Sequence, residues 1–196
     1  MSIETTPEAP ITLTPVGIVR SEITTPMLTA DASGLTLTER MNRIRSYHRR
    51  VKAATSRIEV FSRWADLLDG IEDFSHILIL YWPHLLPPER RDLRRVHPMG
   101  RKDLPEKGIF ATCSPARPNP VLVSAVPLVS RDGNILAVRG LEAVDGSPVI
   151  DIKPYSPAYL QVADLRVAGW MTRIQRELES DEDSSETPGT SPAAKQ

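Results

Sequence analysis

The chain of 196 residues has little cysteine and few aromatic residues: one cysteine, Cys113, and 5% aromatics. A single cysteine excludes a disulfide framework within the chain and argues against a cysteine-based metal site. The longest apolar run, HILILYW, is far shorter than the roughly 20 residues that a membrane-spanning helix needs. The opening MSIETTPEAP lacks the basic patch and apolar run of a secretory signal, so we expect a cytoplasmic protein with no membrane partner.

The chain also lacks a strong net charge, since its formal value is −1. The charges are unevenly spread, however. The first basic segment, Arg40 to Arg57, holds seven basic residues and no acid. The second, Arg90 to Lys107, also holds seven, diluted by acids such as Asp92 and Asp103. Contact with RNA phosphates would explain this density, and a solvated face is the alternative.

Composition indicates one folded domain. Residues 1–10 and 180–196 are polar and carry proline, and the second stretch is acidic and rich in serine, so we expect both to be disordered. With 40% hydrophobic residues, the remaining residues 11–179 can bury one sizeable core.

Strand patterns dominate this body. Apolar residues alternate or run together in residues 14–23, 56–64, 75–82, 120–130, 134–144 and 148–153. Asp132-Gly133 between two such runs predicts a hairpin, and Pro127 inside one predicts an edge or a bulge. No GxGxxG motif is present, which disfavours a Rossmann fold. The pattern favours a mainly β fold, a compact antiparallel β-barrel.

Helices are few. We expect one from Leu37 to Ala54 with Thr38 as its cap, and a short one within RWADLLDGI. Apolar residues at helical spacing predict an amphipathic helix from about Asp164 to Glu179.

Two proline-bearing motifs concentrate polar side chains. In GIFATCSPARPNP, Arg117 and Asn119 each precede a proline, which restricts their backbones and presents their side chains on a stiff loop. An arginine held in this way suits a planar or carboxylate-bearing ligand, and a rigid loop whose arginine pairs with a neighbouring acid is the alternative. In LEAVDGSPVIDIKPY, Asp151 and Lys153 share one strand face, either as an ion pair or as part of a polar pocket.

Histidine and cysteine give weaker indications. His48, His76, His84 and His97 have no zinc-ligand spacing, and such isolated histidines are usually core or loop residues. Cys113 has no evident histidine partner, so we do not assign it as a nucleophile.

Together these motifs resemble the TsaA-like family, whose best-known members are tRNA methyltransferases of the TrmO type. The resemblance rests on GIFATCSPARPNP and VRGLEAVDGSPVIDIKPY, with PVGIVRSEI and IEDFSHILILYWPH in support. It implies a β-barrel that binds S-adenosylmethionine, forms a homodimer with the cofactor near the subunit interface, and methylates the exocyclic amine of threonylcarbamoyladenosine beside the tRNA anticodon. No metal is implied.

The resemblance also implies site residues. Matching the motifs assigns cofactor binding to His84, Leu85, Cys113, Arg117, Asn119, Leu122, Glu142, Ala143, Val144 and Asp145. The tRNA would contact the two basic segments. Since a carbamoylated amine is a weak nucleophile, a base would help the transfer, and Asp145 and Asp151 are the candidates.

Two departures from the family pattern leave alternatives open. Many relatives have arginine at the position of Cys113, where it helps to hold the cofactor, and many carry a Pro-Arg-Gln element where this chain reads TTPMLTADA. Relatives with full tRNA activity often have an additional C-terminal domain. A methyltransferase of the same fold with another substrate, and a non-catalytic regulator that binds the cofactor or RNA, therefore remain alternative interpretations.

Overall fold

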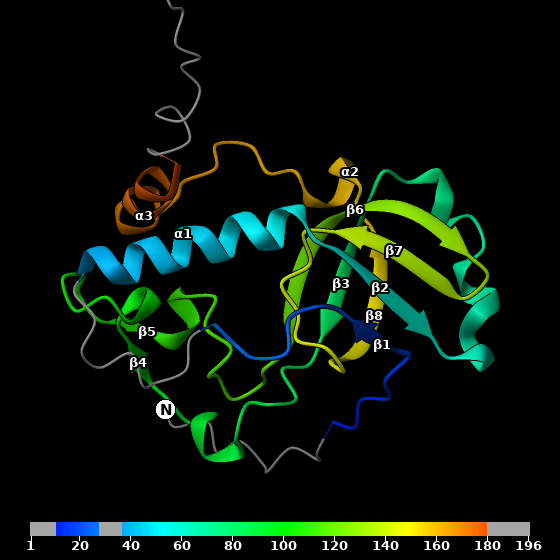
Figure 1. Cartoon of the computed structure of the whole chain (residues 1–196), viewed down its shortest axis with the longest axis horizontal. Helices are drawn as coiled ribbons and strands as arrows, with labels where there is room; N and C mark the ends of the chain where they lie inside the picture. The colour runs from blue at the N-terminus through cyan, green and yellow to red at the C-terminus, as the bar shows by residue number, and fades with distance from the viewer. Residues whose placement is uncertain (1–10, 28–36, 180–196) are drawn as a thin grey trace, which may run out of the picture.

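A closed β-barrel forms the body of the molecule. The structure, a computed structural model, describes residues 11–27 and 37–179. Antiparallel strands close the barrel in the order β1-β2-β7-β6-β3-β8 (Figure 1). Their bounds are β1 Gly17–Arg20, β2 Thr55–Val60, β3 His76–Tyr81, β6 Leu122–Asp132, β7 Ile135–Arg139 and β8 Pro148–Pro154. The predicted antiparallel barrel is confirmed, whereas the predicted disordered ends lie outside the described residues.

Alternation along the strands builds the core. In β3, Ile77, Ile79 and Tyr81 are buried, while Leu78 and Leu80 between them are half-buried on the opposite face. Fully buried positions recur in the other strands: Val19, Ile58, Leu136, Val138 and Val149 are 0% exposed. Burial of each such side chain contributes roughly 1.5–3 kcal/mol, so this interior dominates the stability of the barrel.

Glycine and proline shape two strands. A Cβ atom on Gly17 would lie 2.6 Å from the Glu59 carbonyl oxygen, so only glycine allows β1 this close to β2. Pro127 pairs with His76 inside the closed barrel and is not at an edge. The β6–β7 register shifts just beyond Pro127. The predicted bulge is therefore observed, and the predicted edge position is not. The β6–β7 hairpin is confirmed, with its turn one residue later than predicted, at residues 133–134.

Helix α1, Leu37–Ala53, lies in the connection between β1 and β2, and its C-terminal end meets the barrel (Figure 1). The predicted helix is confirmed, but Thr38 lies inside its first turn and is not its cap. Its inward face is apolar, with Met41, Ile44 and Val51 buried.

The other elements are short. The helix predicted within RWADLLDGI is a 3-10 helix, Ser62–Leu68. The further 3-10 helices of the described residues are Ile71–Asp73, Pro88–Arg90, Pro98–Gly100 and Ile109–Ala111. A separate two-stranded sheet consists of β4, Arg95–Val96, and β5, Lys107–Gly108. Two α-helices follow the barrel: α2, Pro157–Leu160, and α3, Gly169–Glu179. Helix α3 begins five residues later than predicted. Asp164 has a left-handed backbone, with φ 52°, which a helix cannot accommodate.

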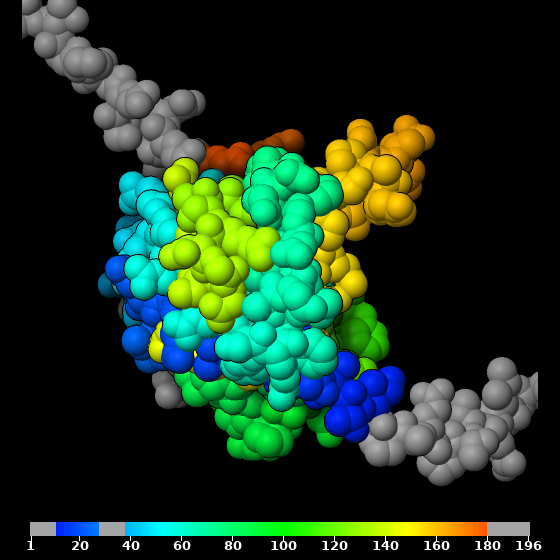
Figure 2. Space-filling model, turned by 90° about the vertical axis from the view of Figure 1, so that its right-hand side faces the viewer, coloured from blue at the N-terminus to red at the C-terminus, as the bar shows by residue number. Residues whose placement is uncertain are grey.

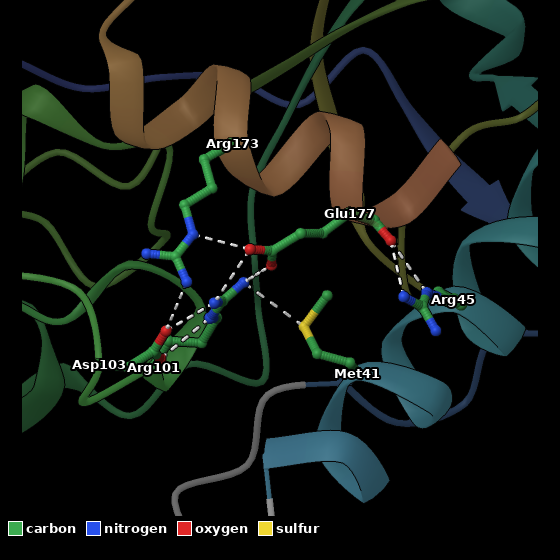
Figure 3. Close-up of polar contacts among 6 residues, drawn as sticks. All are labelled: Met41, Arg45, Arg101, Asp103, Arg173 and Glu177. Atoms are coloured by element: carbon green, nitrogen blue, oxygen red, sulfur yellow. Dashed lines mark hydrogen bonds and ion pairs between the residues drawn. The ribbon is translucent and has the colours of Figure 1, made fainter. Parts of the chain in front are cut away.

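A buried arginine attaches α3 to the rest of the molecule (Figure 3). Arg101 has a side chain only 1% exposed, and its guanidinium forms ion pairs with Asp103, at 2.6 Å, and with Glu177 of α3. Arg45 of α1 donates to the Glu177 carbonyl oxygen at 2.8 Å, and Arg173 reaches the Glu177 carboxylate at 2.8 Å. The pKa values of Asp103 and Glu177 are lowered, mainly by hydrogen bonds from Arg101. Glu177 of α3 is therefore bonded both to Arg101 and to Arg45 of α1.

The chain between β8 and α3 stands away from this body. We call residues 155–168 the arm, and Figure 2 shows its yellow and orange part projecting from the surface. Every arm residue except Ser156 is exposed. Its exposed apolar side chains are Tyr155, Tyr159, Leu160, Val162, Leu165 and Val167. An apolar segment with so few internal contacts is typical of an interaction surface.

None of the helices in the described ranges is long and apolar enough to span a lipid bilayer.

Candidate functional site

The loop between β7 and β8 is fixed to the end of β1. The Asp145 backbone N–H donates to the Ile23 carbonyl oxygen at 2.7 Å, and the Asp145 carboxylate accepts from the Ser21 N–H at 3.1 Å. The Ser21 hydroxyl donates to the Ala143 carbonyl oxygen at 2.7 Å. Residues 142–145, implied by the family resemblance to bind the cofactor, are thus held firmly beside residues 21–23.

His84 joins this loop from the end of β3. Its ring Nδ1 lies 3.4 Å from the Ser147 hydroxyl, and its Nε2 would lie 3.6 Å from a Cβ on Gly146. Gly146 adopts a left-handed φ of 80°, which favours glycine and turns the loop under the imidazole. Leu85, next in sequence, is 49% exposed. Two of the sequence-predicted segments therefore meet here.

Tyr81 connects a third segment to the same place. It pairs with Leu122 at the start of β6, and its hydroxyl donates to the Glu142 carbonyl oxygen at 2.7 Å. Leu122 is half-buried and packs against the barrel core. The structure consequently brings His84, Leu122 and residues 142–145 to one end of the barrel, which we call the loop end.

The GIFATCSPARPNP loop contributes differently from expectation. Arg117 donates to the carbonyl oxygens of Thr112 and Ser114, the latter at 2.9 Å, so it braces its own loop. The rigid loop of the alternative interpretation is observed, but Arg117 bonds to backbone carbonyls and not to a neighbouring acid. Cys113 and Asn119 are exposed. The prolines and Arg117 together hold this loop rigid.

Asp151 and Lys153 form an ion pair on the barrel exterior. Their side-chain atoms are 2.6 Å apart, and the two side chains are 42% and 57% exposed. Asp151 also accepts a hydrogen bond from the Ile152 N–H at 2.9 Å. The structural ion pair is therefore the better of the two interpretations.

Helix α1 adds two residues that sequence reasoning missed. The Tyr47 hydroxyl and the His48 imidazole lie near enough to the Glu142 carboxyl to shift its pKa. The Tyr47 and His48 rings lie edge to face with centroids 6.4 Å apart, and the Arg50 guanidinium lies 5.7 Å from the Tyr47 ring centroid. Tyr47 lies three residues after buried Ile44, and this spacing could have placed it on the inward face.

The local environment shifts the pKa of several of these groups. Glu142 is exposed as a residue, but protein atoms crowd its carboxyl, and this desolvation raises its pKa. The charge of His48 and the Tyr47 hydrogen bond act in the opposite direction. Desolvation, then the negative charge of Glu142, raises the pKa of the Tyr47 hydroxyl. The loop end therefore contains a carboxyl that is more basic than usual.

The described residues contain no group of three or more His, Cys, Asp or Glu side chains placed to hold a metal ion.

Comparison with known proteins identifies the family. Residues 39–160 match the family model described as tRNA-methyltransferase O N-terminal domain. The chain therefore belongs to this family, which confirms the resemblance drawn from the two proline-bearing motifs.

Individual relatives agree with this assignment. A "Probable S-adenosyl-L-methionine-binding protein" of Methanothermobacter thermautotrophicus is 44% identical over 145 residues, covering 74% of this chain and 90% of that protein. The tRNA (adenine(37)-N6)-methyltransferase of Escherichia coli K12 is 38% identical over 123 residues, covering 55% of this chain and 48% of that enzyme.

A solved structure described as "Crystal structure of TrmO" is similar with a TM-score of 0.59 and 27% identity. The match covers 82% of this chain and 64% of that one. The chain thus spans less than two thirds of that structure and about half of the E. coli enzyme.

Proposed function

We propose that this protein binds S-adenosylmethionine at the loop end and transfers its methyl group to the exocyclic amine of threonylcarbamoyladenosine in a tRNA anticodon loop. One observation carries the proposal: His84, Leu122 and residues 142–145, distant in sequence, converge at one end of the barrel. The names of the relatives support both the cofactor and the tRNA substrate.

The residues at the loop end fit such a cofactor. The Glu142 carboxylate and the His84 imidazole can bond to hydroxyl and amino groups, while Leu85 and Leu122 offer apolar surface to a planar base. When bound, the cofactor supplies an electrophilic methyl group on a sulfonium. Cys113 is an exposed thiol where many relatives have arginine, so we expect weaker affinity for the cofactor carboxylate.

Helix α1 provides the basic surface for tRNA. Arg43, Arg49 and Lys52 are exposed, and within the described ranges they have no ion pair with any carboxylate. Uncompensated cations on one helix attract a phosphate backbone. In the second basic segment, Arg101 is buried and Arg95 lies 3.5 Å from Glu106, so fewer of its cations are available.

A second copy of the chain fits the exposed apolar surface. The arm presents Tyr159, Leu160 and Leu165, and the outer face of β6 presents Val123 and Val129 at 62% and 48% exposure. One chain thus carries both an apolar projection and an apolar strip, which supports the homodimer implied by the family resemblance.

Calorimetric titration with S-adenosylmethionine, with ATP as the control ligand, tests cofactor binding. Incubation with tRNA that carries threonylcarbamoyladenosine, followed by mass spectrometry of the nucleosides, tests the reaction. We expect specific cofactor binding and a gain of one methyl group on the modified adenosine. A folded protein that binds no cofactor, either alone or with tRNA, would contradict the proposal.

Cys113 favours a second candidate, a regulator that binds the cofactor without turnover. Its exposed thiol stands where the arginine of many relatives would orient the cofactor. Cofactor binding without methylation of any tRNA would identify this function. A Cys113→Arg variant that gained activity would show that the thiol is the cause.

A further inference from the structure

We propose that a cavity lined by part of the GIFATCSPARPNP loop receives the threonylcarbamoyl group of the substrate nucleoside, and that Arg94 binds its carboxylate; this role rests on the proposed function. The group is attached to the same nitrogen that accepts the methyl group. Unlike the amine of unmodified adenosine, it carries a carboxylate, a hydroxyl and a urea N–H. A site that binds these groups therefore distinguishes the modified nucleoside from ordinary adenosine.

The cavity has a volume of about 540 Å³, which is within the usual range of small-molecule sites. Its apolar lining includes Leu93, Ile109 and Phe110. Ile109 is buried, whereas the Phe110 side chain is 79% exposed. An aromatic ring this open to solvent is available to stack on an unpaired base of single-stranded RNA. The cavity thus combines an apolar wall with a stacking surface.

Two charged side chains, Asp92 and Arg94, also line the cavity. Within the described ranges, neither forms an ion pair. The planar fork of an arginine suits a carboxylate, and an aspartate oxygen accepts hydrogen bonds from N–H and O–H groups. The two side chains are therefore complementary to the carboxylate and to the donors of the threonylcarbamoyl group.

The backbone that carries Arg94 is fixed. The Ile109 N–H donates to the Arg94 carbonyl oxygen at 2.9 Å, and the next residue, Arg95, pairs with Gly108 in the β4–β5 sheet. The Arg94 side chain is exposed. An unpaired guanidinium on a fixed backbone is partly preorganised, which reduces the cost of binding a ligand.

The cavity belongs to a segment that begins and ends at the loop end. Residues 82–121 connect β3 to β6, and the strand residues on either side, Tyr81 and Leu122, pair with each other. Within this segment the Arg91 guanidinium lies 5.1 Å from the Trp82 ring centroid, so the chain next to the cavity is held against a residue that directly follows β3. The cavity is thus attached to the end of the barrel proposed for the cofactor.

The test is a double-mutant cycle in which one partner is the RNA. A fluorescein-labelled anticodon stem-loop is prepared with and without the threonylcarbamoyl group, and fluorescence anisotropy gives its affinity for each protein. We expect the wild type to prefer the modified RNA by about 10- to 100-fold, and Arg94→Met to lose most of this preference. Arg90→Met removes an exposed arginine of the same segment that does not line the cavity. This control should weaken both complexes equally and keep the preference.

The variant Gly108→Leu fills the cavity without a change of charge. Gly108 lines the cavity and has φ −58° and ψ 144°, which any residue can adopt. An added Cβ would meet no atom within 4 Å apart from its chain neighbours, so the variant should fold, which circular dichroism checks. It should also lose the preference for the modified RNA. Gly169→Leu, at a glycine with equally open surroundings away from the cavity, is the control.

The two proposals fail in different ways. Equal affinity of the wild type for both RNAs overturns the role of the cavity, and so does an Arg94→Met protein that keeps the full preference. Methylation of the modified tRNA by the wild type would still support the proposed function in either case. A wild type that binds the cofactor but methylates no tRNA contradicts the proposed function, whereas a preference lost in Arg94→Met would still support the cavity as the binding site.

Discussion

Tyr81 and Glu142 join the barrel core to the loop end through one hydrogen bond, 2.7 Å long, from the tyrosine hydroxyl to the glutamate carbonyl oxygen. Tyr81 is 5% exposed, so water cannot easily replace its hydroxyl. The loop proposed to hold the cofactor is consequently supported from inside the barrel.

The first prediction concerns this hydrogen bond. Tyr81→Phe keeps the ring and leaves the Glu142 carbonyl oxygen without its donor, so the free energy of unfolding should fall by about 1 kcal/mol. Urea denaturation measures it. Tyr155→Phe, at a tyrosine that is 39% exposed, is the control and should unfold like the wild type. Equal stability of Tyr81→Phe and the wild type would show that the hydrogen bond contributes nothing.

The second prediction concerns Arg101. Arg101→Met leaves Asp103 and Glu177, whose side chains are 31% and 30% exposed, without the guanidinium that pairs with both. Loss of a hydrogen bond to a charged group typically costs about 1.5–3 kcal/mol. We expect unfolding at lower denaturant concentration and faster proteolysis of the chain that leads to α3. Arg173→Met removes a guanidinium that is 55% exposed and should cost about 1 kcal/mol or less. If the two variants were equally stable, α3 would not depend on the buried guanidinium.

The same cluster predicts a pH dependence of stability. The pKa values of Asp103 and Glu177 are lower in the folded state than their ordinary values of 3.8 and 4.5. Their stabilising contribution is therefore complete above the ordinary values and is lost as the pH falls through the lowered ones. Unfolding free energies of the wild type should decline over this acidic range, and those of Arg101→Met should decline less. Parallel curves for the two proteins would be inconsistent with this origin.

The fourth prediction concerns the exposed basic residues of α1. Arg43→Glu with Arg49→Glu should weaken binding of an anticodon stem-loop RNA and reduce the slope of log K against log salt by about 1 for each lost phosphate contact. Fluorescence anisotropy at several salt concentrations measures this slope. The variant should still bind S-adenosylmethionine, which shows that the RNA effect is local. Unchanged RNA affinity would place the tRNA on another surface.

The fifth prediction concerns the arm. Val162→Asp with Leu165→Asp puts two charges on side chains that are 61% and 73% exposed, so the single chain should fold normally. We expect the wild type to be a dimer and the variant a monomer in size-exclusion chromatography with light scattering. Ser180→Asp, beyond the arm, is the control substitution. A variant that remained dimeric would exclude the arm as the contact.

The sequence contains enough information to predict the barrel but not the contacts that complete the site. Alternation marks the strands, as in Ile77 and Ile79, because each strand has one buried face. Besides Asp103, the partners of Arg101 are Met41 and Glu177, 60 and 76 residues away, so no local pattern indicates that this basic residue is buried. Arg117 was expected on a stiff loop, but its choice of backbone acceptors depends on how that loop folds. The contact between Tyr47 and Glu142 likewise exists only once α1 reaches the barrel.

The position of α1 in the chain has a consequence for how such proteins diverge. Strands β1 and β2 are paired antiparallel neighbours, so a short turn would be enough to join them, and the helix is an insertion into a hairpin. Its exchange for an unrelated segment would leave every hydrogen bond of the barrel in place. Selection can therefore change the surface that we propose for tRNA binding by exchanging this one segment, while the strands that frame the loop end are inherited intact.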